Sequence, residues 1–358
     1  MIEADDGVIP LGTGQMATSI ARREFISAVG GAMALSGEAA MVAWPKSVFA
    51  QTTGEMPRIA MVLVGEQADP DSHAFVAAFE EGMRAAGLTA GDNVRLDYRW
   101  IGADPQRAAA AAAEVIGLNP TVIVTVGSAA AVAMRRATAT IPIVFAIVSD
   151  PIGQGLLSSL AHPGGNITGF SNFEPGIIGK WLGLLREIVP HTTRVAVMFN
   201  PATAPYNEPF FQRPTEGAAR SPNVEVIRAP VHDDGEIEAV VERLAAAPNG
   251  ALLVPSDSFT YFRSSLIVAL AAKYRLPAIY SFRRFVVEGG LVDYSVDAFE
   301  QVRSAASYAG RIIKGAKPGE LPVQQPTKYT LVINLKTAKT LGLKVSPDVV
   351  SIADDLIE

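Results

Sequence analysis

The feature that most constrains the fold is a unit that repeats from residue 58 onwards. A short apolar run, RIAMVLV (58–64), is followed by a turn and then by Phe75, Phe79 and Met83 at helical spacing. Similar units follow, with further strands expected at 94–100, 121–126, 143–148 and 167–170. Strands that alternate with helices in this way predict parallel sheets with helices packed on their faces.

The pattern starts again near the middle of the chain. RVAVMF (194–199) closely echoes the opening strand. Four more strands are expected at 224–229, 251–254, 278–280 and 291–294. Two series of β–α units predict an α/β fold with two similar parallel-sheet lobes and a ligand cleft between them. We expect residues 58–172, with about 300–358, to form the first lobe, because the strand at 329–334 is interpreted as returning to it. The second lobe would be 173–299.

The N-terminal segment has the features of an export signal. Arg22 and Arg23 precede an apolar run rich in small residues (25–42), and Val48-Phe49-Ala50 suits cleavage by signal peptidase. A membrane anchor would need about 20 uninterrupted apolar residues, whereas this run contains Glu38. We therefore predict that 1–50 is a removed signal peptide, similar to the twin-arginine type. The general secretory route and a packed amphipathic helix are the alternatives.

Composition excludes several classes of function. There is no cysteine, and the four histidines are far apart in sequence, so neither a disulfide nor a metal site is expected. A net charge of -6 and scattered basic residues do not indicate a nucleic-acid partner. A DNA-binding regulator would need a helix-turn-helix head, whereas residues 1–57 contain the export-like segment. No cofactor is expected.

Candidate ligand-binding residues follow the strands, because ligands of open parallel sheets bind at the carboxyl ends of strands. Ten residues on these loops are predicted to contact the ligand: Gln67, Ser128, Ala129, Asp150, Asn200, Tyr206, Asp257, Phe259, Tyr280 and Tyr294.

Two of these residues have a specific expected role and an alternative. Ser128 follows Gly127 at the start of a helix, where its hydroxyl and free backbone N–H groups would hold a carboxylate; alternatively it is only an N-cap. Asp150 would pair with a ligand ammonium or hydroxyl, or else form an Asx-type turn. Aromatic residues of the second lobe would stack on a planar ligand, although each singly also suits a core position.

Signatures of catalysis are weak. The loop after the first strand, VGEQADPD, lacks a G-x-G-x-x-G fingerprint, and the chain has no G-x-S-x-G elbow and no phosphate loop. A hydrolase that uses Ser128 or Asp150 is the alternative function. His73 is the only histidine on a predicted cleft loop, which argues against this alternative.

Several longer phrases match a known family. PGGNITGF (163–170), IPIVFAIVSDPIGQGLLSSL (141–160), ELPVQQPTKYTLVINLKTAKTLGL (320–343) and ADDLIE (353–358) resemble the substrate-binding proteins of ATP-binding-cassette (ABC) importers, in the tryptophan/tyrosine-type subgroup. The resemblance implies a type I periplasmic binding protein fold, three crossover segments as a hinge, closure over a small solute, and no catalysis. The family's ligand loops map onto 127–129, 149–150, 200–201, 257–259 and Tyr280.

The resemblance also sets the expected function. The chain would be the periplasmic component of an ABC importer, a monomer that captures an amino acid or an aromatic organic acid and presents it to membrane permease and ATPase subunits. It departs from the family at Asp293-Tyr294-Ser295, where Ser-Tyr-Gly is common, and at Pro205, Pro209 and Pro214. These departures affect the second-lobe wall of the cleft, so the ligand need not be an aromatic amino acid.

Overall fold

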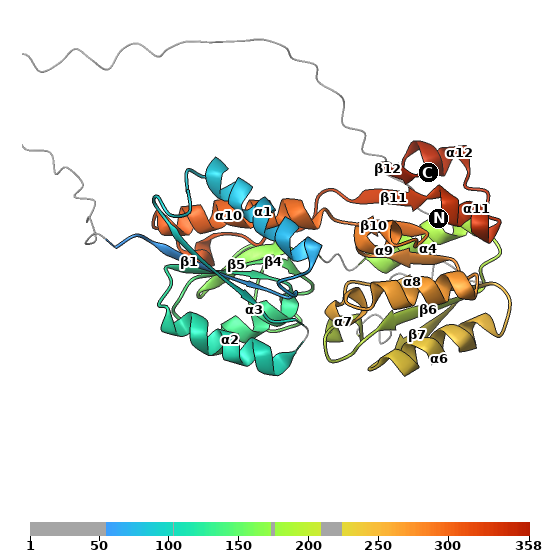
Figure 1. Cartoon of the computed structure of the whole chain (residues 1–358), viewed down its shortest axis with the longest axis horizontal. Coiled ribbons are helices and arrows are strands. Elements are labelled where there is room, and N and C mark those ends of the chain that lie inside the picture. Colours follow the sequence, from blue (N-terminus) through green and yellow to red (C-terminus); the bar gives the residue numbers. More distant parts are fainter. Residues whose placement is uncertain (1–54, 103, 173–175, 209–223) are drawn as a thin grey trace, which may run out of the picture. The chain divides into compact units, whose positions relative to one another are not determined.

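The computed structural model describes residues 55–102, 104–172, 176–208 and 224–358. The predicted signal peptide, 1–50, lies outside these residues and stays a prediction. Residues 55–358 form one compact unit that contains two β-sheets (Figure 1). Each sheet, with the helices on it, is called a lobe below.

The first sheet is parallel throughout, with the strand order β2-β1-β3-β4-β5. Its strands are β1 (Arg58–Leu63), β2 (Arg95–Trp100), β3 (Val122–Val126), β4 (Ile143–Val148) and β5 (Ile167–Ser171). Helices α1 (Pro70–Ala85) and α10 (Ala298–Ile313) pack on one face, and α2 (Pro105–Gly117) and α3 (Ser128–Ala137) cover the other (Figure 1). The first lobe therefore has the predicted three-layer arrangement.

The second sheet has the order β12-β11-β10-β9-β8-β6-β7. Its strands are β6 (Arg194–Phe199), β7 (Glu225–Pro230), β8 (Gly250–Val254), β9 (Ala278–Tyr280), β10 (Val292–Ser295), β11 (Thr330–Asn334) and β12 (Asp355–Ile357). Its helices are α4 (Ile177–Ile188), α6 (Asp234–Ala245), α7 (Ser258–Tyr261), α8 (Ser264–Lys273), α9 (Arg283–Val287), α11 (Leu335–Leu341) and α12 (Pro347–Ser351). Short 3-10 turns span Pro205–Asn207 and Pro318–Glu320. The pairing of β10 with β11 is antiparallel, and the other pairings are parallel.

Local sequence signals explain where several helices begin and end. The side chain of Asp104 accepts a hydrogen bond from the Gln106 N–H at 2.8 Å, and Pro105 occupies the first turn of α2, as expected. Asp297 caps α10 in the same way through Phe299 N–H. Helix α11 ends at Gly342, whose φ of 75° suits a residue without a side chain.

The prediction that 329–334 returns to the first lobe is wrong. Strand β11 pairs with β10 in the second sheet, with Val292 opposite Ile333. The physical reason is burial, because Leu331 and Ile333 pack into the second-lobe core beside Leu291. Helix α10 is the element that returns to the first lobe, where it packs against α1. The predicted assignment of 300–358 to the first lobe therefore fails after α10.

Among the described helices and strands, the chain crosses between the sheets three times. These crossovers lie between β5 and α4, between β10 and α10, and between α10 and β11. Their number agrees with the hinge that the resemblance implied.

Candidate ligand-binding site

Two adjoining cavities lie among loops at the ends of strands from both sheets. Both are narrow, with free volumes of about 30 Å³ and 60 Å³. The first, called the aromatic chamber, is lined by residues that include Asn172, Trp181, Asn207, Ser281, Tyr294 and Tyr329. The second, called the helix-end chamber, is lined by residues that include Gly127, Ser128, Ala129, Thr203 and Tyr261. Ile147, Tyr206, Ser256 and Phe282 line both.

The helix-end chamber is built around the start of α3. Gly127 joins β3 to α3 with a φ of 93°, and a Cβ at this position would lie 2.9 Å from Val64 Cγ2, so only glycine fits. The next residue, Ser128, accepts hydrogen bonds at Oγ from Ser149 N–H and from Gln154 Nε2, both at 3.2 Å. No side chain caps α3, so its first N–H groups and its dipole favour an anion here.

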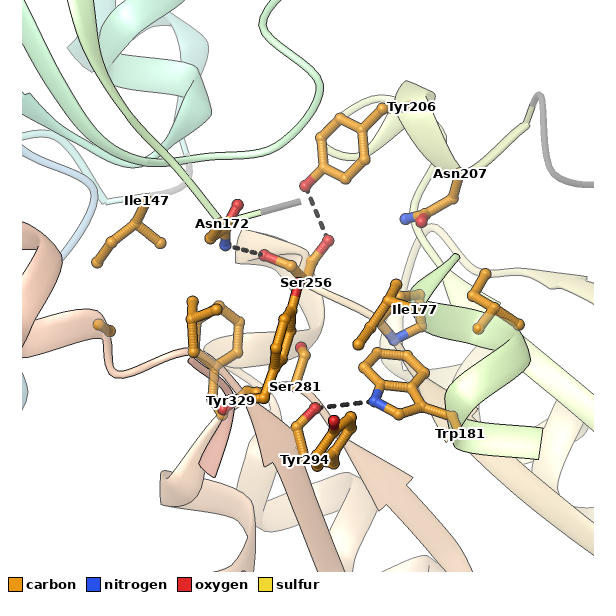
Figure 2. A pocket seen from close by; sticks show the side chains of 16 residues that line it. Ile147, Asn172, Ile177, Trp181, Tyr206, Asn207, Ser256, Ser281, Tyr294 and Tyr329 are labelled. Carbon is orange, nitrogen blue, oxygen red and sulfur yellow. Dashed lines mark hydrogen bonds between the residues drawn. The ribbon is translucent and has the colours of Figure 1, made fainter. Parts of the chain in front are cut away.

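The aromatic chamber is held in shape by hydrogen bonds between its own walls (Figure 2). Trp181 on α4 donates through Nε1 to the Tyr294 carbonyl oxygen at 2.8 Å. Tyr294 also stacks on Tyr329, with ring centroids 5.4 Å apart. The Tyr206 hydroxyl donates to the Ser256 carbonyl at 2.8 Å. The rings that line the chamber are therefore fixed in place, which suits stacking against a planar ligand.

Asn172 joins the two lobes at the first crossover. Its Nδ2 donates to Ser256 Oγ at 3.1 Å, and its Oδ1 accepts from the Ser149 hydroxyl at 2.9 Å. Ser149 follows a first-lobe strand and Ser256 follows a second-lobe strand. The amide of Asn172 therefore connects loops of both sheets beside the cavities.

Two polar atoms of the aromatic chamber have no hydrogen-bond partner among the described residues. They are Nδ2 of Asn207, a residue that is 2% exposed, and Oγ of Ser281, a residue that is 8% exposed. A buried polar group without a partner destabilises a protein by about 1–3 kcal/mol. Such groups in a cavity wall are natural partners for a ligand.

Ile147 is a strained residue that lines both chambers. Its φ is 57°, which is unusual for a β-branched residue, and it lies where β4 shifts register against β5. The Ile147 N–H donates to Gln301 Oε1 at 3.1 Å, and Gln301 Nε2 donates to the Ser171 carbonyl at 2.8 Å. Strain of this kind costs about 1–3 kcal/mol and clusters at ligand sites.

Four of the ten predicted residues line the chambers. Ser128 and Ala129 line the helix-end chamber, Tyr294 lines the aromatic chamber, and Tyr206 lines both. The other six line neither chamber: Gln67, Asp150, Asn200, Asp257, Phe259 and Tyr280.

Asp150, Phe259 and Tyr280 instead have clear structural roles. Asp150 accepts a hydrogen bond from Gly153 N–H at 2.9 Å, which is the Asx-type turn given above as the alternative. Phe259 packs in the second-lobe core, with the Arg263 guanidinium 3.8 Å from its ring centroid. Tyr280 is fully buried and stacks on Phe285 with ring centroids 4.6 Å apart. Gln67 is exposed.

Asp257 and Asn200 together organise a loop of the second lobe. Asp257 is 1% exposed and accepts hydrogen bonds from Asn200 N–H at 2.8 Å and from Phe259 N–H at 2.9 Å. It also accepts one from the Thr203 hydroxyl. Burial raises the pKa of Asp257, and these hydrogen bonds oppose that effect. Its carboxylate holds the segment that leads to Tyr206.

A second buried carboxyl, Asp293, lies on β10 next to Tyr294. It is 1% exposed; one oxygen accepts a hydrogen bond from the Ser295 hydroxyl at 3.1 Å, and Oδ1 has no partner among the described residues. Burial raises the pKa of Asp293 to about 7, although Ser295 and Arg283 lower it. Asp293 contributes to a larger cavity of about 640 Å³, which Ser295, Phe282 and Tyr261 also line.

An ion-pair cluster connects the two lobes beside the helix-end chamber. Arg284 on α9 donates through Nη1 to Asp69 Oδ2 at 2.8 Å, and lies 3.4 Å from Asp71 Oδ2. Asp69 is also the N-cap of α1, and the Tyr261 hydroxyl donates to Asp71. We call these four residues the interlobe clasp. It joins the start of α1 in the first lobe to α7 and α9 in the second.

Sequence reasoning missed five residues of the aromatic chamber: Asn172, Trp181, Asn207, Ser281 and Tyr329. A signal existed for Ser281, because it directly follows a strand that was predicted correctly. Trp181 sits at helical spacing between apolar residues and is indistinguishable from a core residue in sequence. Tyr329 precedes a strand whose antiparallel partner could not be predicted.

Comparison with known proteins identifies the family. The family described as ABC transporter substrate binding protein matches residues 62–357. The chain belongs to this family. Its members are solute-binding proteins that bind small molecules and work with the other components of ABC transporters.

A curated relative and two solved structures are similar along most of this substrate-binding protein. The Tyrosine-binding protein of Clostridioides difficile (strain R20291) is 26% identical over 281 residues, 78% of this chain and 79% of the relative. A conserved domain protein from Vibrio cholerae has a TM-score of 0.77 at 25% identity, covering 84% of this chain and 100% of that one.

The other solved structure is an ABC domain from Streptococcus pneumonia in complex with L-Trp. It has a TM-score of 0.77 at 22% identity, covering 85% of this chain and 100% of that one. These likenesses confirm the predicted fold class, that of type I periplasmic binding proteins.

Neither a membrane-spanning helix nor a metal-binding cluster is found among the described residues. None of their helices is long and apolar enough to cross a membrane. Their His, Cys, Asp and Glu side chains form no group of three or more that is suited to a metal ion.

Proposed function

We propose that this protein is the solute-binding component of an ABC importer and that it captures an amino acid or an aromatic organic acid between its lobes. The observation that carries the proposal is the pair of adjoining cavities, which combine a helix N-terminus with a wall of fixed aromatic rings. The predicted signal peptide at 1–50 would deliver it to the periplasm, where it would meet the permease and ATPase subunits as a monomer.

The ligand's carboxylate would bind in the helix-end chamber. The first N–H groups of α3 and the Ser128 hydroxyl are arranged around the same cavity wall. Ser128 Oγ accepts two hydrogen bonds and also lies within hydrogen-bonding reach of the Tyr206 hydroxyl, so a ligand carboxylate would compete with Tyr206 for the Ser128 proton. The planar part of the ligand would then extend past Phe282 into the aromatic chamber.

Ligand binding would shift the lobes towards the closed arrangement. Tyr206 and Ser256 of the second lobe line the helix-end chamber together with Ser128 of the first. A ligand that touches both lobes binds the closed state better than the open one, and only this difference in affinity shifts the population. The three crossovers are the segments where the backbone would bend.

The relatives support the class of ligand. One relative carries the name Tyrosine-binding protein, and one similar structure contains L-Trp. Both ligands are aromatic molecules with a carboxylate. We transfer that general chemistry, and not the individual amino acid, to this chain.

A panel of amino acids and aromatic acids would test the proposal by thermal melting and calorimetry. We expect at least one to raise the melting temperature, and Ser128→Ala to weaken its binding roughly ten- to a hundredfold, because a hydrogen bond to a charged group is lost. Ser304→Ala on α10 is the matched control, since it lines neither chamber. Failure of every acid and amino acid to bind would refute the proposal.

No second function is proposed. For the alternative hydrolase, the Ser128 hydroxyl would need a general base. Its described partners are a backbone N–H, a glutamine amide and the Tyr206 hydroxyl, whose pKa burial raises, so none of them is a suitable base. His73, the histidine considered for this role, is exposed and lines neither chamber.

A further inference from the structure

The two chambers also indicate what the far end of the ligand carries. Resting on the proposed function, we infer that the ligand is an aromatic carboxylic acid whose ring bears a neutral hydrogen-bond acceptor at the end opposite the carboxylate. Asn207 and Ser281 bind that acceptor and set the specificity. A phenolic hydroxyl, a ring ether and a ring carbonyl are groups of this kind.

The first observation is that the chambers adjoin. Ile147, Tyr206, Ser256 and Phe282 line both, while the start of α3 lines only the helix-end chamber. Asn207 and Ser281 line only the aromatic chamber. A ligand anchored by its carboxylate at α3 would therefore point its opposite end into the chamber that Asn207 and Ser281 line.

The second observation is which polar atoms of the aromatic chamber already have partners. Trp181 Nε1, Asn172 Nδ2 and the Tyr206 hydroxyl all donate within the protein (Figure 2). Asn207 Nδ2 and Ser281 Oγ lack partners among the described residues although both are buried. An amide nitrogen only donates, and a hydroxyl donates as well as accepts, so a ligand satisfies both by presenting an acceptor.

The third observation is the chemical character of the wall. Ile177, Trp181, Tyr294 and Phe282 supply apolar and aromatic surface, and the polar groups beside them are neutral amides and hydroxyls. Burying an isolated charge against such a wall is far more costly than burying a neutral polar group that finds a hydrogen bond. The wall thus favours an uncharged substituent on an aromatic ring.

Asn207 and Ser281 would give selectivity in two ways: they would bind a ligand that carries the acceptor, and they would disfavour a ligand that lacks it. A ligand with a methyl group in place of the acceptor would leave the two donors buried and unpaired. Sites built to hydrogen-bond a ligand group reject analogues that lack it much more strongly than apolar pockets reject size changes. We therefore expect a preference of at least tenfold for the acceptor-bearing ligand.

Calorimetric titration of the purified protein with matched probes would test the inference. The first pair is 4-hydroxycinnamate and 4-methylcinnamate, which have nearly the same size and differ in the acceptor; the corresponding benzoates cover a shorter ligand. We expect the hydroxyl acid to bind at least tenfold more tightly. Ser281→Ala and Asn207→Leu should each reduce this preference severalfold while leaving the affinity for the methyl acid unchanged or improved.

The methyl acid acts as an internal control, because a folding defect would weaken both acids together. Should a variant fail to fold, the preference of the unmodified protein still decides the question. Equal binding of the hydroxyl and methyl acids would overturn the inference and leave the proposed function intact.

Absence of binding for all these probes and for the wider panel would refute both the inference and the proposed function.

Discussion

Asp257 and Asp293 are both almost fully buried carboxyl groups of the second lobe, yet their surroundings differ. Asp257 accepts hydrogen bonds from two backbone N–H groups and from the Thr203 hydroxyl. Asp293 accepts one from the Ser295 hydroxyl, and its Oδ1 has no partner in the part of the chain that the structure describes. A buried carboxylate is tolerated in a fold when its oxygens accept hydrogen bonds, and it destabilises the fold when they do not. The first organises a loop beside the site, and the second makes stability depend on pH.

The largest expected effect is the loss of Asp257. Asp257→Ala should lower the free energy of unfolding by roughly 3–5 kcal/mol, because it leaves buried donors unpaired and removes the cap of α7. Denaturant unfolding would measure this. Asp233→Ala is the matched control, since Asp233 is an exposed N-cap and should lose only about 1 kcal/mol. Equal losses of stability in the two variants would mean that burial of the Asp257 hydrogen-bond network contributes nothing.

Replacing Asp293 should have the next largest effect on the free energy of unfolding, and at alkaline pH it should stabilise the protein where the loss of Asp257 destabilises it. The pKa of Asp293 is raised from 3.8 to about 7 in the folded protein, so the native state binds more protons than the unfolded chain between these values. The stability that this group contributes is therefore present below about pH 4 and is lost as the pH rises through 7, by on the order of 4 kcal/mol.

Asp293→Asn should flatten this pH dependence and stabilise the protein at pH 8. The measurement is denaturant unfolding at several pH values between 4 and 8, with the exposed Asp92→Asn as control. An unchanged slope in Asp293→Asn would show that the carboxyl is not the group that titrates.

The interlobe clasp should give the smallest effect on stability. Its ion pairs are partly exposed, so Arg284→Met should change the free energy of unfolding by about 1 kcal/mol or less. Because the clasp joins the lobes, the variant should nevertheless increase the radius of gyration of the protein in small-angle X-ray scattering. Arg283→Met removes an exposed pair with Asp355 and should leave the radius unchanged. Identical scattering of both variants would show that the clasp does not hold the lobes together.

Elements whose signals are local were predictable from the sequence. The strand 194–199, the cap Asp104 and the place of Ser128 at the start of a helix each follow from neighbouring residues, and the structure agrees with them. The ligand-binding role of Ser128 stays a prediction. Asp257 and Phe259 were predicted as ligand contacts because they follow a strand. The structure uses them as cap and core instead, and only the burial of the loop distinguishes these roles.

Features that depend on long-range pairing were not predictable. The antiparallel register of β10 and β11 brings Tyr294 next to Tyr329, and nothing local in either segment specifies that pairing. From the sequence, Ile147 is indistinguishable from an ordinary strand residue. Its left-handed backbone conformation arises from the register shift against β5 and from its hydrogen bond to Gln301, which are both long-range features. The aromatic chamber therefore emerges only when the whole chain is folded.

The route of the chain through α10 has a consequence for biosynthesis. One face of the first sheet is covered by α1 together with α10, and α10 ends at Ile313 in a chain of 358 residues. The N-terminal lobe therefore cannot close its core while the ribosome is still making the second lobe. Folding of the first lobe therefore waits until α10 has been made, after most of the second lobe, unlike the usual order in which N-terminal domains fold first. Until then, the apolar face of the first sheet that α10 covers stays exposed and accessible to chaperones.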